Sequence, residues 1–207
     1  MVRAVAGTPQ IDLDGPLPVC RIDDVPAIHA AASDWTRTLL DPMFSLSPDQ
    51  IPPDLVPTSE ADIQGGGSVR LVVIDDLRSL TLAAADDGVR LRVGSAYRSY
   101  EDQRQTFASL ERAYGRSVAE TSAARPGHSE HQLGTTIDFV GGETWLATHA
   151  WRYGFVMSYP ADRSPRYTCY KAEPWHYRDV GRQVAAAVHA SGLSLREWLW
   201  LHADEVP

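Results

Sequence analysis

The chain has 207 residues, a length typical of one domain or of one domain with an N-terminal extension. Hydrophobic residues make up 43% of the chain and charged residues 22%, as in an ordinary globular protein. A chain of this size buries enough surface to fold without a metal ion, so a bound metal would serve catalysis rather than stability. The formal net charge of −8 argues against a nucleic-acid-binding protein and against attraction to an anionic membrane surface.

The first 67 residues lack the periodicity of long secondary-structure elements. Proline recurs throughout this stretch and the run Gly65–Gly67 closes it, and both residue types interrupt helices and strands. We expect one short helix here, over residues 34–40. We interpret residues 1–67 as an N-terminal arm that packs on a domain comprising residues 68–207.

The next segment predicts two helices separated by a strand. Apolar spacing predicts a buried helix over residues 69–85, and alternation of apolar residues predicts a strand over residues 89–96. Ser99 and Asp102 form a capping-box pattern, so a second helix should run from Ser99 to Tyr114 and end at Gly115.

Short strands and helices continue to the C-terminus. We expect strands over residues 134–140, 155–159 and 173–178, and helices over residues 143–153, 180–190 and 195–202. Ser194 with Glu197 should cap the last helix. Because helices flank a few strands without regular βαβ alternation, the pattern predicts an α+β fold.

The two cysteines, Cys20 and Cys169, lie far apart and form no CxxC motif, so they are either free thiols or one disulfide. No run approaches the roughly 20 apolar residues that span a bilayer. The first ten residues lack the apolar core of a secretory signal peptide. The sequence therefore leaves open a cytoplasmic protein and an exported one whose signal has been removed.

Two segments place histidines close to carboxylates. In residues 126–138, His131 lies between Gly127 and Gly134, where the backbone can turn, and Asp138 follows in an apolar strand. A buried carboxylate is costly unless it is paired or bound to a metal. In the second segment, Glu173 and His176 lie on either side of a Pro-Trp pair.

This residue set is typical of a catalytic zinc site, which takes three ligands from His, Asp, Glu and Cys and leaves one position open. A fourth protein ligand would close the site, so we expect His128 to lie at its rim. The remaining histidines lack carboxylate neighbours and should be surface or core residues: His29, His149, His189 and His202.

Three motifs resemble those of the VanY-type zinc D-alanyl-D-alanine carboxypeptidases. Residues 129–138, SEHQLGTTID, are similar to the family's SxHxxGxAxD signature, with Thr136 in place of the usual alanine. Residues 173–180, EPWHYRDV, are similar to its EPWHxRYV element, with Asp179 in place of tyrosine. Residues 95–103, SAYRSYEDQ, resemble its S-x-YRS-x-x-x-Q element. The motifs occur in the family's order and cover roughly residues 68–190.

The resemblance implies one Zn²⁺ ion held by His131, Asp138 and His176, with Glu173 as general base and then general acid. Arg98 would be both catalytic and substrate-binding. Gln103, Ser129 and Trp175 would complete the substrate site. The implied fold has a small antiparallel sheet flanked by helices, as in the zinc D-Ala-D-Ala dipeptidases and the Hedgehog signalling domain.

Family members act on bacterial cell-wall stem peptides and are usually exported or surface-bound. The resemblance therefore implies a carboxypeptidase that removes C-terminal D-alanine from peptidoglycan stem peptides, outside the cytoplasm and as a monomer. It also implies a disulfide between Cys20 and Cys169. D,D-carboxypeptidase, L,D-carboxypeptidase and dipeptidase activities all stay open, because the motifs do not encode the depth of the pocket.

Three other functions are alternatives to a zinc carboxypeptidase. Non-haem Fe(II) oxygenases also use two histidines and a carboxylate, but they have no use for Glu173. The SxxK motif of serine peptidases is absent, since the sole lysine, Lys171, follows Thr168 by three residues. A non-catalytic cell-wall-binding module on the same fold would be expected to have lost Glu173 or a ligand. All four positions are intact, which favours an enzyme.

Overall fold

The structure, a computed structural model, describes residues 15–204. Its centre is a five-stranded sheet in the order β4-β6-β7-β9-β8, formed by Gln64–Gly65, Arg92–Ser95, Thr136–Val140, His176–Asp179 and Phe155–Met157. Neighbouring strands are antiparallel except for the parallel edge pair β4–β6. Two small sheets pair β1 (Val25–Pro26) with β2 (Phe44–Ser45) and β3 (Leu55–Pro57) with β5 (Ser68–Arg70).

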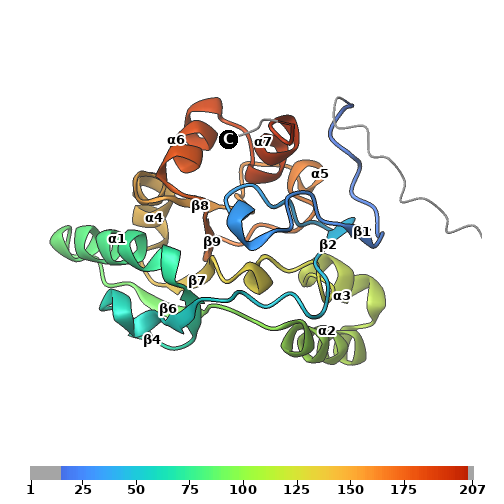
Figure 1. Cartoon of the computed structure of the whole chain (residues 1–207), viewed down its shortest axis with the longest axis horizontal. Coiled ribbons are helices and arrows are strands. Elements are labelled where there is room, and N and C mark those ends of the chain that lie inside the picture. Colours follow the sequence, from blue (N-terminus) through green and yellow to red (C-terminus); the bar gives the residue numbers. More distant parts are fainter. Residues whose placement is uncertain (1–14, 205–207) are drawn as a thin grey trace, which may run out of the picture.

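Helices surround this sheet and confirm the predicted α+β class. Within residues 15–204 the α-helices are α1 (Ile74–Asp86), α2 (Tyr100–Tyr114), α3 (Arg116–Ser122), α4 (Glu143–His149), α5 (Pro165–Thr168), α6 (Arg182–Ser191) and α7 (Leu195–Leu201). Figure 1 shows α1 and α4 on one side of the strands, α2 and α3 on the other, and α6 and α7 beyond β8. The 3₁₀ helices are η1 (Ala32–Asp34), η2 (Thr58–Ala61), η3 (Leu71–Val73), η4 (Glu130–Leu133) and η5 (Ala150–Tyr153).

Side chains of β7 and β9 alternate between the main core and a polar face. Ile137, Phe139 and Tyr177 pack with α1 and α4 in the core. Because successive residues of a strand point to opposite faces, Asp138 and His176 lie on the other face. The register pairs these two residues directly across the strands. The sheet thus presents two of the three predicted metal ligands side by side.

The described part of the N-terminal segment, residues 15–67, packs against the rest of the chain. Leu39, Met43 and Phe44 pack with α6 and α7 in a second core. The buried Asp41 carboxylate forms an ion pair with Arg196 in α7, with Oδ2 and Nε 2.7 Å apart. At its end, β4 adds an edge strand to the central sheet. Residues on both sides of position 67 build the same sheet. The division into an N-terminal arm and a domain at this residue stays a prediction.

The expected Cys20–Cys169 disulfide is present, with Cα atoms 5.4 Å apart. It ties the N-terminal segment to the end of α5.

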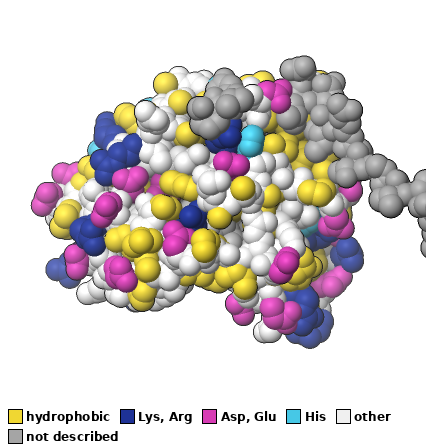
Figure 2. Space-filling view, in the orientation of Figure 1, with side chains coloured by type: hydrophobic (Ala, Val, Ile, Leu, Met, Phe, Trp, Pro, Cys, Tyr) yellow, Lys and Arg dark blue, Asp and Glu magenta, His cyan; other side chains and the backbone are white. Residues whose placement is uncertain are grey.

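No helix in residues 15–204 has the length and apolar character needed to cross a bilayer. Figure 2 shows acidic and basic side chains interspersed over the visible face.

Several predicted elements differ from the structure. The helix expected over residues 69–85 begins only at Ile74, because Ser68–Arg70 pair with Leu55–Pro57 as β5. The helix expected over residues 34–40 is wrong, and only η1 forms nearby. The strands expected over 89–96 and 173–178 are shorter, and α3 and α5 were not predicted. In the first case a partner strand in the arm, far away in sequence, overrides the local periodicity.

The predicted N-terminal caps of two helices, α2 and α7, are present in the structure. Ser99 caps α2 by accepting a hydrogen bond from the Asp102 backbone N–H. The reciprocal capping box predicted for the last helix is complete at Ser194 and Glu197. Both caps are local in sequence, which is why the pattern predicts them.

Candidate metal centre and active site

Three elements bring the predicted metal ligands together. His131 lies in η4, between Gly127 and Gly134, whose positive φ angles of 87° and 72° turn the chain. Asp138 lies in β7 and His176 begins β9. The Arg98 backbone N–H donates to the His131 carbonyl at 3.2 Å, which links the β6–α2 connection to η4.

The three side chains have the spacing of a shared metal site. His131 Nε2 lies 3.3 Å from Asp138 Oδ2, and His176 Nδ1 lies 3.1 Å from Asp138 Oδ1. One ligand atom from each residue lies within 4.8 Å of the others, the one such group that the described part of the chain contains. Two imidazoles and one carboxylate match the donor set of catalytic zinc. The residues therefore fit a zinc ion with room for a further ligand.

Each imidazole contacts a hydrogen-bond acceptor through the ring nitrogen that faces away from the cluster. His131 Nδ1 lies 2.7 Å from the Ala96 carbonyl oxygen, so Nδ1–H donates and the Nε2 lone pair faces the cluster. His176 Nε2 lies 3.0 Å from Glu130 Oε2, so that its Nδ1 faces the cluster. Partners of this kind fix the tautomer of a metal-ligating histidine.

The charges of the cluster respond to burial and to each other. Burial acts to raise the pKa of Asp138, but hydrogen bonds from His131 and His176 hold it well below its usual range. Burial lowers the pKa of His131. Burial also acts to lower the pKa of His176, but hydrogen bonds to Asp138 and Glu130 raise it to about 10. Asp138 is therefore a carboxylate at neutral pH, as a metal ligand must be, whereas a metal ion would have to displace the proton that His176 holds on Nδ1.

Glu173 lies beside the cluster at the end of the β8–β9 connection. Its Oε2 is 3.6 Å from His176 Nδ1, and its backbone N–H donates to the Tyr159 carbonyl at 2.9 Å. Burial, followed by the nearby carboxylates of Asp138 and Glu130, raises its pKa against the opposing effect of His176. A carboxyl with a raised pKa is suited to accept and return a proton.

Arg98 and Gln103 form a second polar pair in the same cavity. The Arg98 guanidinium donates to Gln103 Oε1 at 2.9 Å and lies 4.0 Å from Asp138 Oδ2. The Gln103 side-chain N–H₂ donates to the Ala124 carbonyl at 2.6 Å, so both ends of this buried amide are occupied. Burial lowers the pKa of Arg98, while Asp138 and Glu173 oppose that effect. Gln103 therefore positions Arg98 in this structure.

The cavity that contains these groups has a volume of about 250 Å³. Ser129 is buried in its wall, and Trp175 is 42% exposed. Tyr159 and Tyr170 also line it, and burial raises the pKa of both phenols, which keeps them protonated. The structure thus gathers every predicted site residue around one cavity.

Sequence reasoning missed three residues of this site and misplaced one. Glu130, Tyr159 and Tyr170 contact the cluster or the cavity, but none lies in a pattern that marks it. The position of Glu130 between Ser129 and His131 is the one available signal. His128, expected at the rim, is buried instead, with Nδ1 2.8 Å from the Asp41 carbonyl oxygen. It faces the N-terminal segment because η4 begins after it and turns the chain.

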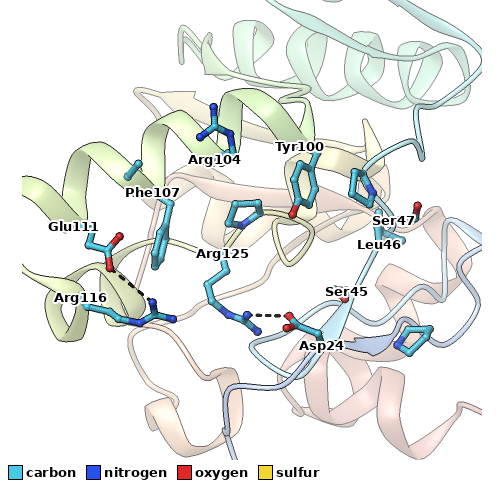
Figure 3. Close-up of a pocket in the computed structure, with 14 residues that line it drawn as sticks. Asp24, Ser45, Leu46, Ser47, Tyr100, Arg104, Phe107, Glu111, Arg116 and Arg125 are labelled. Atoms are coloured by element: carbon cyan, nitrogen blue, oxygen red, sulfur yellow. Dashed lines mark hydrogen bonds and ion pairs between the residues drawn. The ribbon is translucent and has the colours of Figure 1, made fainter. Parts of the chain in front are cut away.

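A larger cavity of about 610 Å³ lies between α2 and the N-terminal segment (Figure 3). Its labelled side chains include Tyr100 and Phe107, and none of the predicted site residues lines it. Its three arginines are already paired: Arg125 with Asp24 at 2.8 Å, Arg116 with Glu111 at 3.8 Å and Arg104 with Glu101 at 2.6 Å. The smaller cavity is therefore the candidate active site.

Comparisons with known proteins agree with this geometry. A D-alanyl-D-alanine carboxypeptidase of Enterococcus faecalis (strain ATCC 700802 / V583) is 34% identical over 155 residues, which cover 66% of this chain and 58% of the relative. The chain spans about three-fifths of the length of the first curated relatives it matches, 60% and 58%. The match leaves the remainder of those relatives unaccounted for.

Two solved structures share the fold. VanYB in complex with D-alanine-D-alanine superimposes with a TM-score of 0.71 at 31% identity, covering 80% of this chain and 97% of VanYB. A mutant of the vancomycin-resistance D,D-pentapeptidase VanY in complex with Zn(II) has a TM-score of 0.71 at 29% identity, covering 80% and 99%. The expected relation to this peptidase fold is confirmed.

The family profile described as D-alanyl-D-alanine carboxypeptidase, VanY, matches residues 67–182. This range contains all three motifs and every predicted site residue. The chain belongs to the VanY family of D-alanyl-D-alanine carboxypeptidases.

Proposed function

We propose that this chain is a zinc-dependent carboxypeptidase that hydrolyses the C-terminal D-alanine from peptidoglycan stem peptides. The observation that carries the proposal is the Glu173 carboxylate, 3.6 Å from His176 Nδ1 and beside three residues that can share one metal ion. A metal-binding module without catalysis has no need of such a carboxylate. The relative solved with Zn(II) and the relative solved with D-alanine-D-alanine support the choice of metal and substrate class.

His131, Asp138 and His176 would hold the zinc ion, which when bound polarises a carbonyl oxygen and lowers the pKa of a water molecule to about 7. Glu173 accepts the proton of the attacking water molecule. It then donates that proton to the leaving D-alanine nitrogen. The raised pKa of Glu173 suits both directions of transfer.

Arg98 supplies the fixed positive charge of the site. Its contact with Gln103 Oε1 holds the guanidinium in the cavity, 4.0 Å from Asp138 Oδ2. A planar guanidinium donates two parallel hydrogen bonds to a carboxylate, so Arg98 is suited to the C-terminal carboxylate of a peptide or to a developing oxyanion. Ser129 and Trp175 lie in the same cavity wall and would contact the rest of the substrate.

We also propose an extracytoplasmic or cell-surface location. The Cys20–Cys169 disulfide supports this, because disulfides persist in oxidising environments and are rare in the cytosol. Peptidoglycan stem peptides are found on the same side of the membrane. We expect a monomer.

Incubation with synthetic tetrapeptide and pentapeptide stems, read by mass spectrometry, tests the proposal. We expect the pentapeptide to lose one D-alanine in the presence of Zn²⁺ and to stay intact with a chelator. Hydrolysis of free D-alanyl-D-alanine, supplied as a third substrate, would instead identify a dipeptidase, and shortening of the tetrapeptide an L,D-carboxypeptidase. His176→Ala is the matched control and should be inactive. No cleavage of either peptide by zinc-loaded protein would contradict the proposed function.

A further inference from the structure

Glu130 is a buried carboxylate directly behind the metal-ligand cluster, with no part in the proposed hydrolysis. It is 5% exposed and precedes His131 in η4, yet it faces the other histidine. Its Oε2 accepts hydrogen bonds from His176 Nε2 at 3.0 Å and from Ser158 Oγ at 2.6 Å. Its Oε1 accepts from the Arg178 guanidinium at 3.1 Å. Three donors therefore compensate the burial of this charge.

The two ring nitrogens of His176 face carboxylates on opposite sides. Nδ1 lies 3.1 Å from Asp138 Oδ1 on the cavity side, and Nε2 lies 3.0 Å from Glu130 Oε2 on the interior side. A histidine binds a metal through an unprotonated nitrogen while its other nitrogen carries the proton. A carboxylate that accepts the Nε2 proton therefore leaves Nδ1 as the ligand atom. The imidazole ring separates Glu130 from the cluster, so Glu130 acts through His176.

The Glu130 carboxylate is in turn held by Arg178, on the side away from His176. Arg178 is 0% exposed, and its second guanidinium nitrogen donates to the Trp35 carbonyl oxygen at 2.7 Å. Because Trp35 belongs to the N-terminal segment, a continuous series of contacts runs from that segment through Arg178 and Glu130 to His176. The N-terminal segment thus helps to fix the orientation of a metal ligand.

We propose that Glu130 is a positioning residue that holds the His176 ring with Nδ1 directed at the metal position. The proposal rests on the zinc site of the proposed function. Loss of such a partner of a metal-ligating histidine typically weakens metal binding roughly 10–100-fold. The same loss is expected here.

The test compares Glu130→Gln with the wild-type full chain in Zn²⁺ competition against a chromophoric chelator. Glutamine keeps the size of the side chain and one acceptor oxygen but loses the charge, so the fold should survive. We expect Zn²⁺ affinity to fall roughly 10–100-fold. Glu101→Gln, which changes an exposed carboxylate paired with Arg104, is the matched control and should bind Zn²⁺ as the wild type does.

Arg178→Met separates positioning from general stability, because it breaks the buried ion pair with Glu130 and leaves the His176–Glu130 contact. Thermal unfolding of the metal-free proteins is measured alongside. Positioning predicts that Glu130→Gln weakens Zn²⁺ binding more than Arg178→Met, although Arg178→Met lowers the melting temperature at least as much. Wild-type Zn²⁺ affinity in Glu130→Gln, or losses that simply follow stability, would overturn it. A wild-type chain that binds no Zn²⁺ would contradict the proposed function as well, so the two failures are distinguishable.

Discussion

The two halves of the active-site cavity are built by different means. Asp138 and His176 lie on adjacent antiparallel strands and His131 on the short helix between glycines, so backbone hydrogen bonds fix the metal half. Glu173 lies in the connection between β8 and β9, where its backbone N–H bond to Tyr159 and a disulfide four residues earlier anchor the chain. Metal binding and proton transfer therefore depend on separate parts of the fold and should be separable by mutation.

The sharpest way to separate the two halves is Glu173→Ala. Because the variant removes the proposed general base and no metal ligand, we expect kcat for D-alanine release to fall about 10²–10⁴-fold. Zinc content, measured by atomic absorption, should stay at the wild-type level. Glu101→Gln, which changes an exposed carboxylate in α2, should leave both quantities unchanged. Full activity of Glu173→Ala would exclude the proposed mechanism.

The second prediction concerns the anchor of the connection that carries Glu173. The double variant Cys20→Ser, Cys169→Ser removes a disulfide that links residues 149 positions apart. We expect the free energy of unfolding to fall by about 2–5 kcal/mol, measured by urea denaturation. Because the metal half does not depend on this bond, kcat should fall while Zn²⁺ affinity is retained. An equal loss of Zn²⁺ affinity would show that the two halves are not independent.

The comparison also explains how much of the site the sequence predicts. His131, Asp138 and Glu173 each lie within a short motif, because local turns and strand alternation place them, and such signals are carried by neighbouring residues. Glu130 contacts His176, 46 positions later, and only the packing of η4 against β9 creates that contact. The disulfide was expected from the family resemblance, since two widely spaced cysteines by themselves leave free thiols and a disulfide both open.

The fold shows the same limit. The β-branched residues around Asp138 predict β7 nearly to its observed bounds, because strand propensity is carried by the segment's own sequence. Ser68–Arg70 form a strand only because residues 55–57 pair with them, and the helical spacing of residues 69–85 hides that partner. Long-range pairing is therefore what single-sequence reasoning misses in this chain.

The smallest expected effect concerns Asp179, a buried carboxylate of β9 that lies outside the cavity. Glu130 has three donors, but Asp179 accepts one hydrogen bond, from the Gly181 backbone N–H at 2.8 Å, and its Oδ2 is buried without a partner. Burial, with the nearby Asp76 carboxylate, raises its pKa well above the usual value. Strand β9 thus carries a buried carboxylate oxygen without a hydrogen-bond partner at the position where this chain departs from the family motif.

Asp179→Asn should therefore stabilise the protein at neutral pH, by on the order of 1 kcal/mol. Between the unfolded pKa of about 3.9 and the raised folded pKa, the folded wild type holds more protons than the unfolded chain, so its stability falls as pH rises through that window. Asparagine does not titrate, so its advantage should vanish below about pH 4 and grow above it. Thermal unfolding across pH measures this, with exposed Asp86→Asn as control. An advantage that is independent of pH would show that the charge of Asp179 is not the cause.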